Sequence, residues 1–332
     1  MSSPGHVADA LHAALAAVAP GTPLRDGLDR VVRAKMGALV VVGDGPEVLA
    51  ICSGGFLLDS PYSPQRLSEL AKMDGAIILS SDASRIARAN VHLVPDPTVP
   101  TSETGTRHRT AERVARSLDV PVVSVSEEMG VINVYAGGAK HQLQDISRLL
   151  DRANQALQTL ERYKARLDDA LSALTANELE DVATVRDVAA VMQRGEMVFR
   201  IANELETMIV ELGVDARLLR LQLDEVYGEI DDEIDLVAAD YPGITASGAG
   251  AGAGSALDDP AAPRGLRLLA RVARVTPTLA AAVVDRFGEL ARLQRATIDE
   301  LAAIDGVDHD LAETIKDTLD RLTETSILDQ YS

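Results

Sequence analysis

Gly37-Ala38-Leu39-Val40-Val41-Val42-Gly43 is the stretch that decides the fold of the first part of the chain. An unbroken run of apolar and β-branched side chains that ends in glycine is typical of a buried strand. Gly43-Asp44-Gly45-Pro46 follows with residues that favour a turn. Because Val48–Ser53 has the composition of a second strand, we expect the two runs to form a hairpin.

Strand-like and helix-like segments go on alternating through residues 1–140, which predicts an α/β domain around a central mixed sheet. Ser63-Pro64 marks a helix start over Ser63–Leu70, since a serine cap and a proline in the first turn both favour one. The further strand candidates are Ala76–Ser80, Val91–Val94, Val120–Val125 and Val131–Tyr135.

The period changes after Gly137-Gly138, and residues 141–245 have a helical pattern. Apolar side chains from Leu143 to Leu174 recur at spacings of three and four, which predicts one long helix with a single apolar stripe. Asp187–Asp240 continues the helical pattern with many acidic residues. We expect an all-α spine or bundle here, and it contains no catalytic constellation.

Residues 246–263 are expected to form a flexible linker, because the small residues of Ala246–Ala256 cannot build a core. A dinucleotide fingerprint is the alternative for its glycines, but no strand precedes them. Residues 264–332 are helical again in short segments. Thr297–Leu301 opens a helix, Ile304–Asp308 forms a tight turn, and Leu311–Leu322 is the next helix.

The composition of the 332 residues limits the function further. A net charge of −19 opposes nonspecific nucleic-acid binding, so any such contact needs a local basic patch. The single cysteine, Cys52, fits a reducing cytoplasm and is expected to be a small buried strand residue, with a nucleophile as the alternative. No signal peptide and no membrane span is apparent, so we expect a cytoplasmic protein.

Three segments have residues suited to nucleotide chemistry. Asp74-Gly75 places a carboxylate at the junction between an expected helix and an expected strand, although such a pair alone is usually only a turn. Thr104–Ala111 contains Arg107 and Arg109 on either side of His108, just before an expected helix at Ala111–Leu118. Since helix N-termini and arginine side chains both favour phosphates, we interpret it as a polyphosphate site rather than a solvated turn.

The third segment, Ser126-Glu127-Glu128, lies at the end of a predicted strand. Carboxylates in that place are candidate Mg²⁺ ligands, and a pair of solvated acids is the alternative. The chain contains no Gly-x-x-x-x-Gly-Lys segment, which argues against an ordinary P-loop ATPase.

Three longer motifs occur in order: Leu70–Leu79, Ala89–Asp96 and Thr104–Arg113. In these motifs the chain resembles the bacterial diadenylate cyclases, and its helical middle and its end resemble the members that survey DNA integrity. The resemblance implies a cyclase domain at 1–140, a helical spine at 141–245 and a helix-hairpin-helix domain at 264–332.

The resemblance also implies roles for individual residues. Asp74, Arg107, His108 and Arg109 match the catalytic motifs, and Asp74 is the expected ligand of Mg²⁺ or Mn²⁺. Glu128 is the better second metal ligand, with Glu127 as the alternative. The expected ATP contacts are Gly75, Ala76, Leu93, Thr106, Arg107, His108, Arg109, Thr110 and Ser126.

The reaction that this resemblance implies joins two ATP molecules into cyclic di-AMP and releases two pyrophosphates. One site holds one ATP, so two subunits must face each other. The resemblance implies a homo-octamer of two face-to-face tetramers.

Ile298–Asp308 resembles a helix-hairpin-helix motif, in which backbone N–H groups bind DNA phosphates without reading the bases. Gly306 and Val307 are the expected hairpin contacts, while Asp308 adds an unfavourable charge. Basic side chains nearby, which are alternatively a solvated helix face, are Arg264, Arg267, Arg271 and Arg274. The resemblance implies branched DNA, such as recombination junctions, as a partner that restrains the cyclase in DNA-damage signalling and repair, with nucleoid association.

Two other functions stay open at this point. One is a scaffold that binds DNA structures and has a regulatory, non-catalytic nucleotide site; bound ATP that is never turned over is its mark. The other is an unrelated nucleotide-binding α/β enzyme, which the missing P-loop and dinucleotide fingerprint disfavour.

Overall fold

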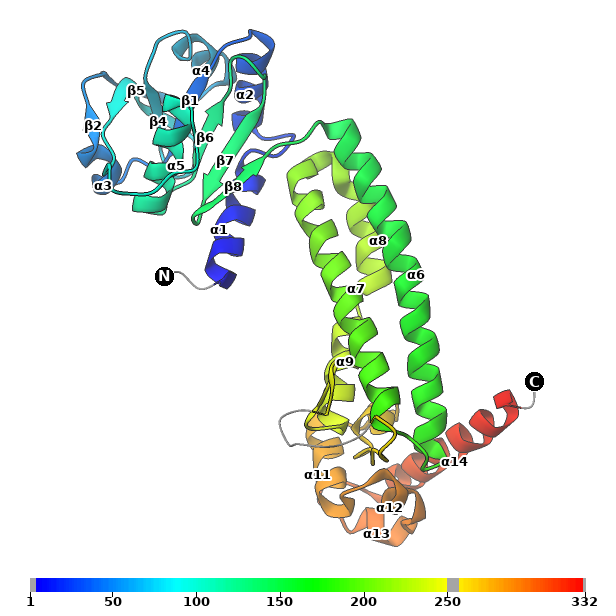
Figure 1. Ribbon diagram of the computed structural model, residues 1–332. Helices are drawn as coiled ribbons and strands as arrows, with labels where there is room; N and C mark the ends of the chain where they lie inside the picture. Colours follow the sequence, from blue (N-terminus) through cyan, green and yellow to red (C-terminus); the bar gives the residue numbers. More distant parts are fainter. Residues whose placement is uncertain (1–3, 250–256, 331–332) are drawn as a thin grey trace. The chain divides into compact units, whose positions relative to one another are not determined.

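The computed structural model describes residues 4–249 and 257–330, and the side chains of 9–248 and 257–325 (Figure 1). Residues 250–256 of the predicted linker lie outside the described residues. The chain divides into two compact units, Met1–Asn154 with Leu205–Arg220, and Gln155–Glu204 with Leu221–Ser332. The first unit combines a sheet with helices and the second is mainly helical, as predicted.

The first unit contains a mixed eight-stranded sheet in the order β2-β5-β4-β1-β6-β7-β8, with β3 also paired to β5. β1 runs parallel to β4 and antiparallel to β6, and the other pairs are antiparallel. The strands are β1 Ala38–Val42, β2 Cys52–Ser53, β3 Phe56–Pro61, β4 Ala76–Leu79, β5 Arg85–Leu93, β6 Val122–Val125, β7 Ile132–Ala136 and β8 Ala139–Gln142.

The predicted hairpin between the first two runs is wrong. Pro46–Ala50 forms the short helix α3, and only Cys52–Ser53 is extended, paired with β5 instead of β1. Proline has no N–H for a strand ladder and favours the first turn of a helix, where Pro46 lies. The partners of β1 are instead β4 and β6, so β1 lies in the middle of the sheet.

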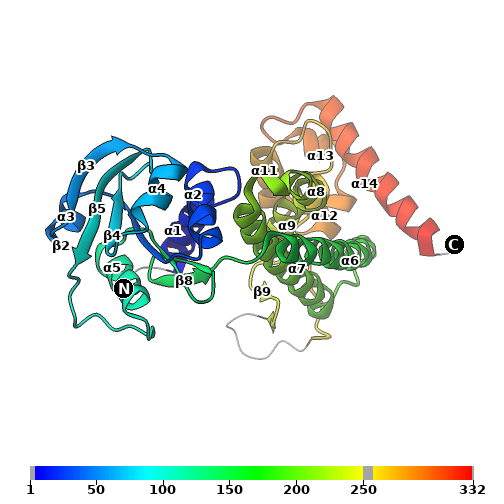
Figure 2. The ribbon, with the colours of Figure 1, turned by 90° about the horizontal axis from the view of Figure 1, so that it is seen from above.

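Helices cover both faces of this sheet (Figure 2). Val40 and Val42 of β1 pack in one buried cluster with residues of α1 (Pro4–Ala17), α2 (Pro23–Arg33) and α4 (Pro64–Leu70). Leu39 and Val41 point to the opposite layer, with α3 and with α5 (Thr106–Leu118). This alternation is the strand period of two, and it makes a three-layer α/β/α domain.

The sequence prediction missed α1 and α2, although Thr22-Pro23 contains a start signal. The Thr22 hydroxyl accepts a hydrogen bond from Arg25 N at 3.1 Å, and Pro23 occupies the first turn. Ser63 caps α4 in the same way, as predicted, by accepting from Arg66 N at 3.2 Å.

Two long helices, α6 (Ile146–Leu179) and α7 (Val185–Leu212), lie side by side and contribute to both units (Figures 1 and 2). The leucines of the predicted stripe in the second unit are buried: Leu157, Leu160, Leu167, Leu171 and Leu174. The 3₁₀ turn Gly213–Ala216 and α8 (Arg217–Tyr227) follow, then α9 (Ile230–Asp240).

Hydrogen-bonded backbone is present at both ends of the predicted linker. Ile244–Thr245 and Gly248–Ala249 pair as the short strands β9 and β10. On the far side, Arg186 N donates to Leu257 O at 2.8 Å, and Ala261 N donates to Ala183 O at 2.8 Å. The described part of 246–263 is therefore less free than its composition suggests.

Five further helices of the second unit, together with the end of α6, enclose a core in which Leu269, Val283, Leu301 and Ile315 are fully buried. They are α10 Leu266–Leu269, α11 Pro277–Phe287, α12 Leu290–Arg295, α13 Ile298–Ala302 and α14 His309–Gln330. Thr297 starts α13 with a capping box that Glu300 completes. No helix in the described part of the chain has the length and apolar character that a membrane crossing requires.

Candidate active site

A cleft of about 470 Å³ lies where β4 begins and β5 ends, beside the start of α5. It brings together most of the predicted site residues. Those that line it are Asp74, Gly75, Ala76, Leu93, Thr106, Arg107, His108, Thr110, Ser126 and Glu128. Leu39, Val91, His92 and Gly105 also line it, and the sequence did not single them out.

Gly75 gives the cleft floor its shape. Its φ is +97°, a conformation that side chains disfavour, and an added Cβ would lie 2.9 Å from both Asn90 C and Val91 O. The chain of β4 therefore approaches the end of β5 closely at this point. Asp74, the residue before, is exposed at the cleft wall.

The first turn of α5 forms another wall. The helix begins at Thr106, so the expectation that Arg107–Arg109 precede a helix starting at Ala111 is wrong. Gly105 takes the extended cap conformation, and Arg109 N donates to Gly105 O at 2.8 Å. No side chain in the described part of the chain caps this end. Its N–H groups and the helix dipole therefore favour an anion in the cleft.

His108 is half-buried, and its Nε2 is a buried atom without a hydrogen-bond partner among the described residues. Burial lowers the pKa of His108; the carboxylate of Glu103 opposes this shift, and the Lys140 and Arg107 cations add to it. The imidazole is therefore neutral near pH 7, and its buried Nε2 is left without a partner among the described residues.

Arg109 does not line the cleft, unlike the other residues of its motif. It is exposed, and its Nη2 donates to Thr104 O at 3.0 Å. Helical residues two positions apart do not share a face, so Arg107 and Arg109 point in different directions once both lie in α5. Within this subunit, the hydrogen bond from Arg109 to Thr104 O holds the loop before α5 in place.

Glu112, a buried carboxylate of α5 that the sequence did not single out, holds that loop in place. It accepts hydrogen bonds from Thr101 Oγ1 at 2.5 Å and Ser102 N at 3.0 Å, and pairs with Arg116 at 2.8 Å. Burial acts to raise the pKa of Glu112, but these hydrogen bonds and the Arg116 cation outweigh it and lower the pKa. The loop and the N-terminal part of α5 are thus fixed to each other.

Ser126 ends β6 in a tight turn that presents the two glutamates. Its hydroxyl accepts from Met129 N at 3.3 Å and its carbonyl from Gly130 N at 3.0 Å. Glu127 and Glu128 are exposed, and both line the cleft that Asp74 also lines.

These carboxylates fit a metal ion that arrives with a nucleotide. Among the described residues, no three His, Cys, Asp or Glu side chains lie close enough to hold a metal. Mg²⁺ is commonly bound by one or two carboxylates together with substrate phosphates and water. Asp74 with one glutamate matches that partial set of ligands.

The predicted DNA-contact role of Arg267 is wrong, because its side chain is 1% exposed. It forms an ion pair with Glu178, and its Nη1 donates to Thr175 Oγ1 at 2.9 Å. Its backbone N donates to Asp240 Oδ2 at 2.9 Å. The side chain thus links α10 to α6 inside the core of the second unit.

The other predicted arginines are paired with carboxylates; Arg271 and Arg274 are exposed, and Arg264 is partly exposed. Arg271 lies 3.2 Å from Glu233, Arg264 lies 3.3 Å from Asp285, and Arg274 lies 3.1 Å from Asp308. A polyanion that binds these arginines must compete with the carboxylates that pair with them.

The hairpin itself is a tight turn between α13 and α14. Gly306 has a φ of +89°, and Val307 is buried with its N–H donated to Ile304 O at 3.0 Å. Asp308 Oδ1 accepts from Leu311 N at 2.7 Å. The aspartate that seemed unfavourable for DNA therefore starts α14.

The fold defines a protein with an α/β domain, a region of long helices and a helix-hairpin-helix domain. Three family models match these parts: the DisA bacterial checkpoint controller nucleotide-binding region at 25–140, its linker region at 143–250, and a SAM-like helix-hairpin-helix tandem at 266–321.

Similar proteins extend over nearly the whole chain. The DNA integrity scanning protein DisA of Frankia alni is 48% identical over 97% of this chain and 98% of its own length. Its counterpart in Streptomyces coelicolor is 47% identical over 97% of this chain and 94% of its own. The chain belongs to the family of DNA integrity scanning proteins, DisA.

Among solved structures, DacA from Staphylococcus aureus is 26% identical over 36% of this chain and 82% of that chain, with a TM-score of 0.29. A hypothetical membrane spanning protein from Bacillus cereus is 24% identical over 37% of this chain and 62% of its own, with a TM-score of 0.33.

Proposed function

We propose that this protein is a diadenylate cyclase that condenses two ATP molecules into cyclic di-AMP and two pyrophosphates. The observation that carries the proposal is the set of groups that line the cleft. There an exposed Asp74 carboxylate, the Arg107 guanidinium and the uncapped start of α5 line one space. Membership in the DisA family supports the same conclusion.

The reaction consists of the same substitution carried out twice. The 3′-oxygen of one ATP forms a bond to the α-phosphorus of the other, while the bond from that phosphorus to the bridging oxygen of the β-phosphate breaks. Pyrophosphate leaves with the electron pair, and the 3′-hydroxyl proton passes to solvent. Repetition with the roles of the nucleotides exchanged closes the ring.

The residues of the cleft act mainly by positioning and by charge. The start of α5 and Arg107 bind phosphate oxygens and stabilise the negative charge that develops there. The apolar side chains of Leu39 and Leu93 offer a surface for the base. Asp74 with Glu128, or with Glu127, would hold Mg²⁺ or Mn²⁺, which would lower the pKa of the attacking hydroxyl and offset phosphate charge.

Each cleft is half of an active centre in this proposal. A space of about 470 Å³ suits one nucleotide. Two subunits must therefore face each other for a hydroxyl to meet a phosphate. The octamer of two face-to-face tetramers satisfies this requirement with closed symmetry.

The helix-hairpin-helix tandem supports a DNA partner, and we propose branched DNA that restrains the cyclase. The candidate contacts are the Gly306 turn, the exposed Arg271 and Arg274 and the partly exposed Arg264, whereas the buried Arg267 cannot reach DNA. A cytoplasmic, nucleoid-associated location and a role in DNA-damage signalling and repair follow from this activity.

The test is ATP turnover by the purified full-length chain, followed by chromatography, with either metal. A four-way junction is added in one arm and a linear duplex of the same composition in another. We expect cyclic di-AMP without DNA and slower formation with the junction only. ATP that binds but yields no product with either metal would instead support a scaffold with a regulatory nucleotide site.

A further inference from the structure

Gly37, the residue before β1, is buried beneath the Arg107 side chain. A Cβ added at Gly37 would lie 1.9 Å from Arg107 Nη1, 2.7 Å from Cζ and 3.2 Å from Nη2. These three nearest atoms belong to one guanidinium group. The group therefore fills the space that any other residue at position 37 would occupy.

The backbone at Gly37 does not itself require glycine. Gly37 is absent from the glycines with positive φ, whereas Gly75 has a φ of +97°. An added Cβ at Gly75 meets main-chain atoms of Asn90 and Val91, which cannot move without disturbing the sheet. At Gly37 the three nearest atoms all belong to the end of one flexible side chain. A methyl group at Gly37 therefore requires the Arg107 side chain to move.

The guanidinium has no other anchor in the described part of the chain. Arg107 is half-buried, yet none of the described residues accepts a hydrogen bond from its guanidinium or pairs with it. By contrast, Arg109 is held by Thr104 O at 3.0 Å. Close packing on the main chain at Gly37 is therefore what limits the positions of the Arg107 head group.

We infer that Gly37 is a positioning residue for Arg107: its missing side chain forms a slot that keeps the guanidinium directed at the phosphates of the bound nucleotide. The identity of the ligand rests on the proposed function. The slot itself rests only on the geometry of the two residues. A side chain that is already held in place loses less conformational entropy on binding than a mobile arginine does.

The experiment is a double-mutant cycle on the full-length protein with Gly37→Ala, Arg107→Ala and the double variant. Binding of a non-hydrolysable ATP analogue is measured by calorimetry and unfolding by heat. We expect Gly37→Ala to weaken binding about tenfold, the size of one charge-assisted hydrogen bond. The same change on the Arg107→Ala background should have no effect, because no guanidinium is left to displace.

Gly45→Ala is the matched control. Gly45 also lies beside β1, its φ is −62°, and an added Cβ meets nothing within 4 Å. Its binding affinity should equal that of the wild type. Unchanged affinity in Gly37→Ala, or an equal further loss when Gly37→Ala is added to Arg107→Ala, would overturn the inference.

Heat unfolding of the variants decides two further outcomes, a variant that does not fold and a wild type that binds no ATP. If Gly37→Ala does not fold, the double variant should fold, since the clash is gone; failure of both would show that glycine is needed for another reason and refute the slot. If the wild type binds no ATP, the proposed function fails. The slot then predicts that Gly37→Ala lowers the unfolding midpoint only when Arg107 is present, and equal shifts refute it.

Discussion

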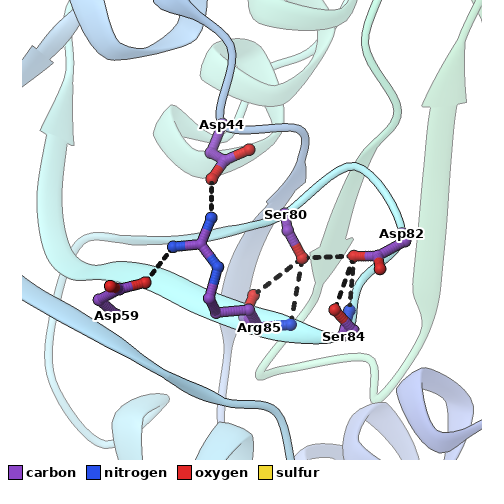
Figure 3. Close-up of polar contacts among 6 residues, drawn as sticks. All are labelled: Asp44, Asp59, Ser80, Asp82, Ser84 and Arg85. Carbon is purple, nitrogen blue, oxygen red and sulfur yellow. Dashed lines mark hydrogen bonds and ion pairs between the residues drawn. The ribbon is translucent and has the colours of Figure 1, made fainter.

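The two ends of the β4–β5 pair differ in how their charged groups are satisfied. At the end where β4 leads into β5, Arg85 pairs with Asp59 and lies 2.7 Å from Asp44, while Asp82 accepts from Ser80 Oγ at 2.6 Å (Figure 3). At the other end, Asp74 and Arg107 line the cleft, and neither has a hydrogen bond or ion pair among the described residues.

The difference separates charges that shape the fold from charges that the fold leaves without a partner. The paired end closes a turn, because the Asp82 carboxylate also accepts from Ser84 N at 3.0 Å. The open end has a carboxylate, a guanidinium and a helix start with no partner of their own. Unpaired groups gathered in a cleft add little to stability and are typical of functional sites.

The largest expected effect is at the open end. Asp74→Asn should reduce cyclic di-AMP formation by about a thousandfold or more, because metal binding and charge stabilisation are lost together. The free energy of unfolding should stay within about 0.5 kcal/mol of the wild type, since no partner is lost. Turnover assays and urea unfolding measure the two quantities. A large loss of stability would show that Asp74 is structural.

Breaking a buried charged pair should cost far more stability than breaking an exposed one. Arg267→Ala leaves Glu178 buried without its cation, which costs about 3–5 kcal/mol of unfolding free energy. Arg264→Ala is the matched control, because Arg264 forms an exposed pair with Asp285 that contributes less than about 1 kcal/mol. Chemical unfolding of both variants checks this, and equal losses would contradict the assigned burial.

The backbone at the open end is expected to be more sensitive than its side chains. Gly75→Ala combines an unfavourable φ with an overlap against Asn90 and Val91. Gly54→Ala is the control, since Gly54 has a φ of +65° but open space around its Cβ position. Gly54→Ala should cost about 1–2 kcal/mol. Gly75→Ala should cost at least about 1 kcal/mol more. Similar losses in both variants would refute the close approach of the two strands.

The smallest effect concerns acid stability at the paired end. The Ser80 hydroxyl, then Ser84, lowers the pKa of Asp82 to about 2 from an ordinary value of 3.8. A lowered folded-state pKa adds stability that is fully present above pH 3.8 and is lost as the pH falls through about 2. In urea unfolding, the difference in free energy of unfolding between the wild type and Asp82→Asn should therefore disappear as the pH falls from 3.8 to about 2. A difference that does not vary with pH would contradict the hydrogen bonds of Asp82 with Ser80 and Ser84.

The sequence predicted those parts of the fold that depend on local pattern. The apolar runs of β1, β4, β6 and β7 and the leucine stripe of α6 were all recognisable. The pairing of β1 with β4 and β6 was not, because it joins segments far apart in the chain. Edge strand β8 was missed, since its alternating and partly exposed residues have no apolar run.

The candidate site was predicted as a set of segments, and the structure decides which side chains meet. Arg107 and Arg109 looked equivalent until the start of α5 at Thr106 fixed their directions. Arg267 looked like a surface cation because burial depends on helices α6 and α9, which are distant in sequence. The role of Gly37 depends on a contact with a residue 70 positions later, which no local pattern reveals.

The central claim is that each cleft is half of a cyclase centre. Its most direct test follows product formation by the full-length chain at decreasing protein concentration, beside sedimentation measurements of its assembly state. We predict two pyrophosphates per cyclic di-AMP and a specific activity that falls as face-to-face assemblies dissociate. ATP binding that persists with no cyclic product at any protein concentration would contradict it.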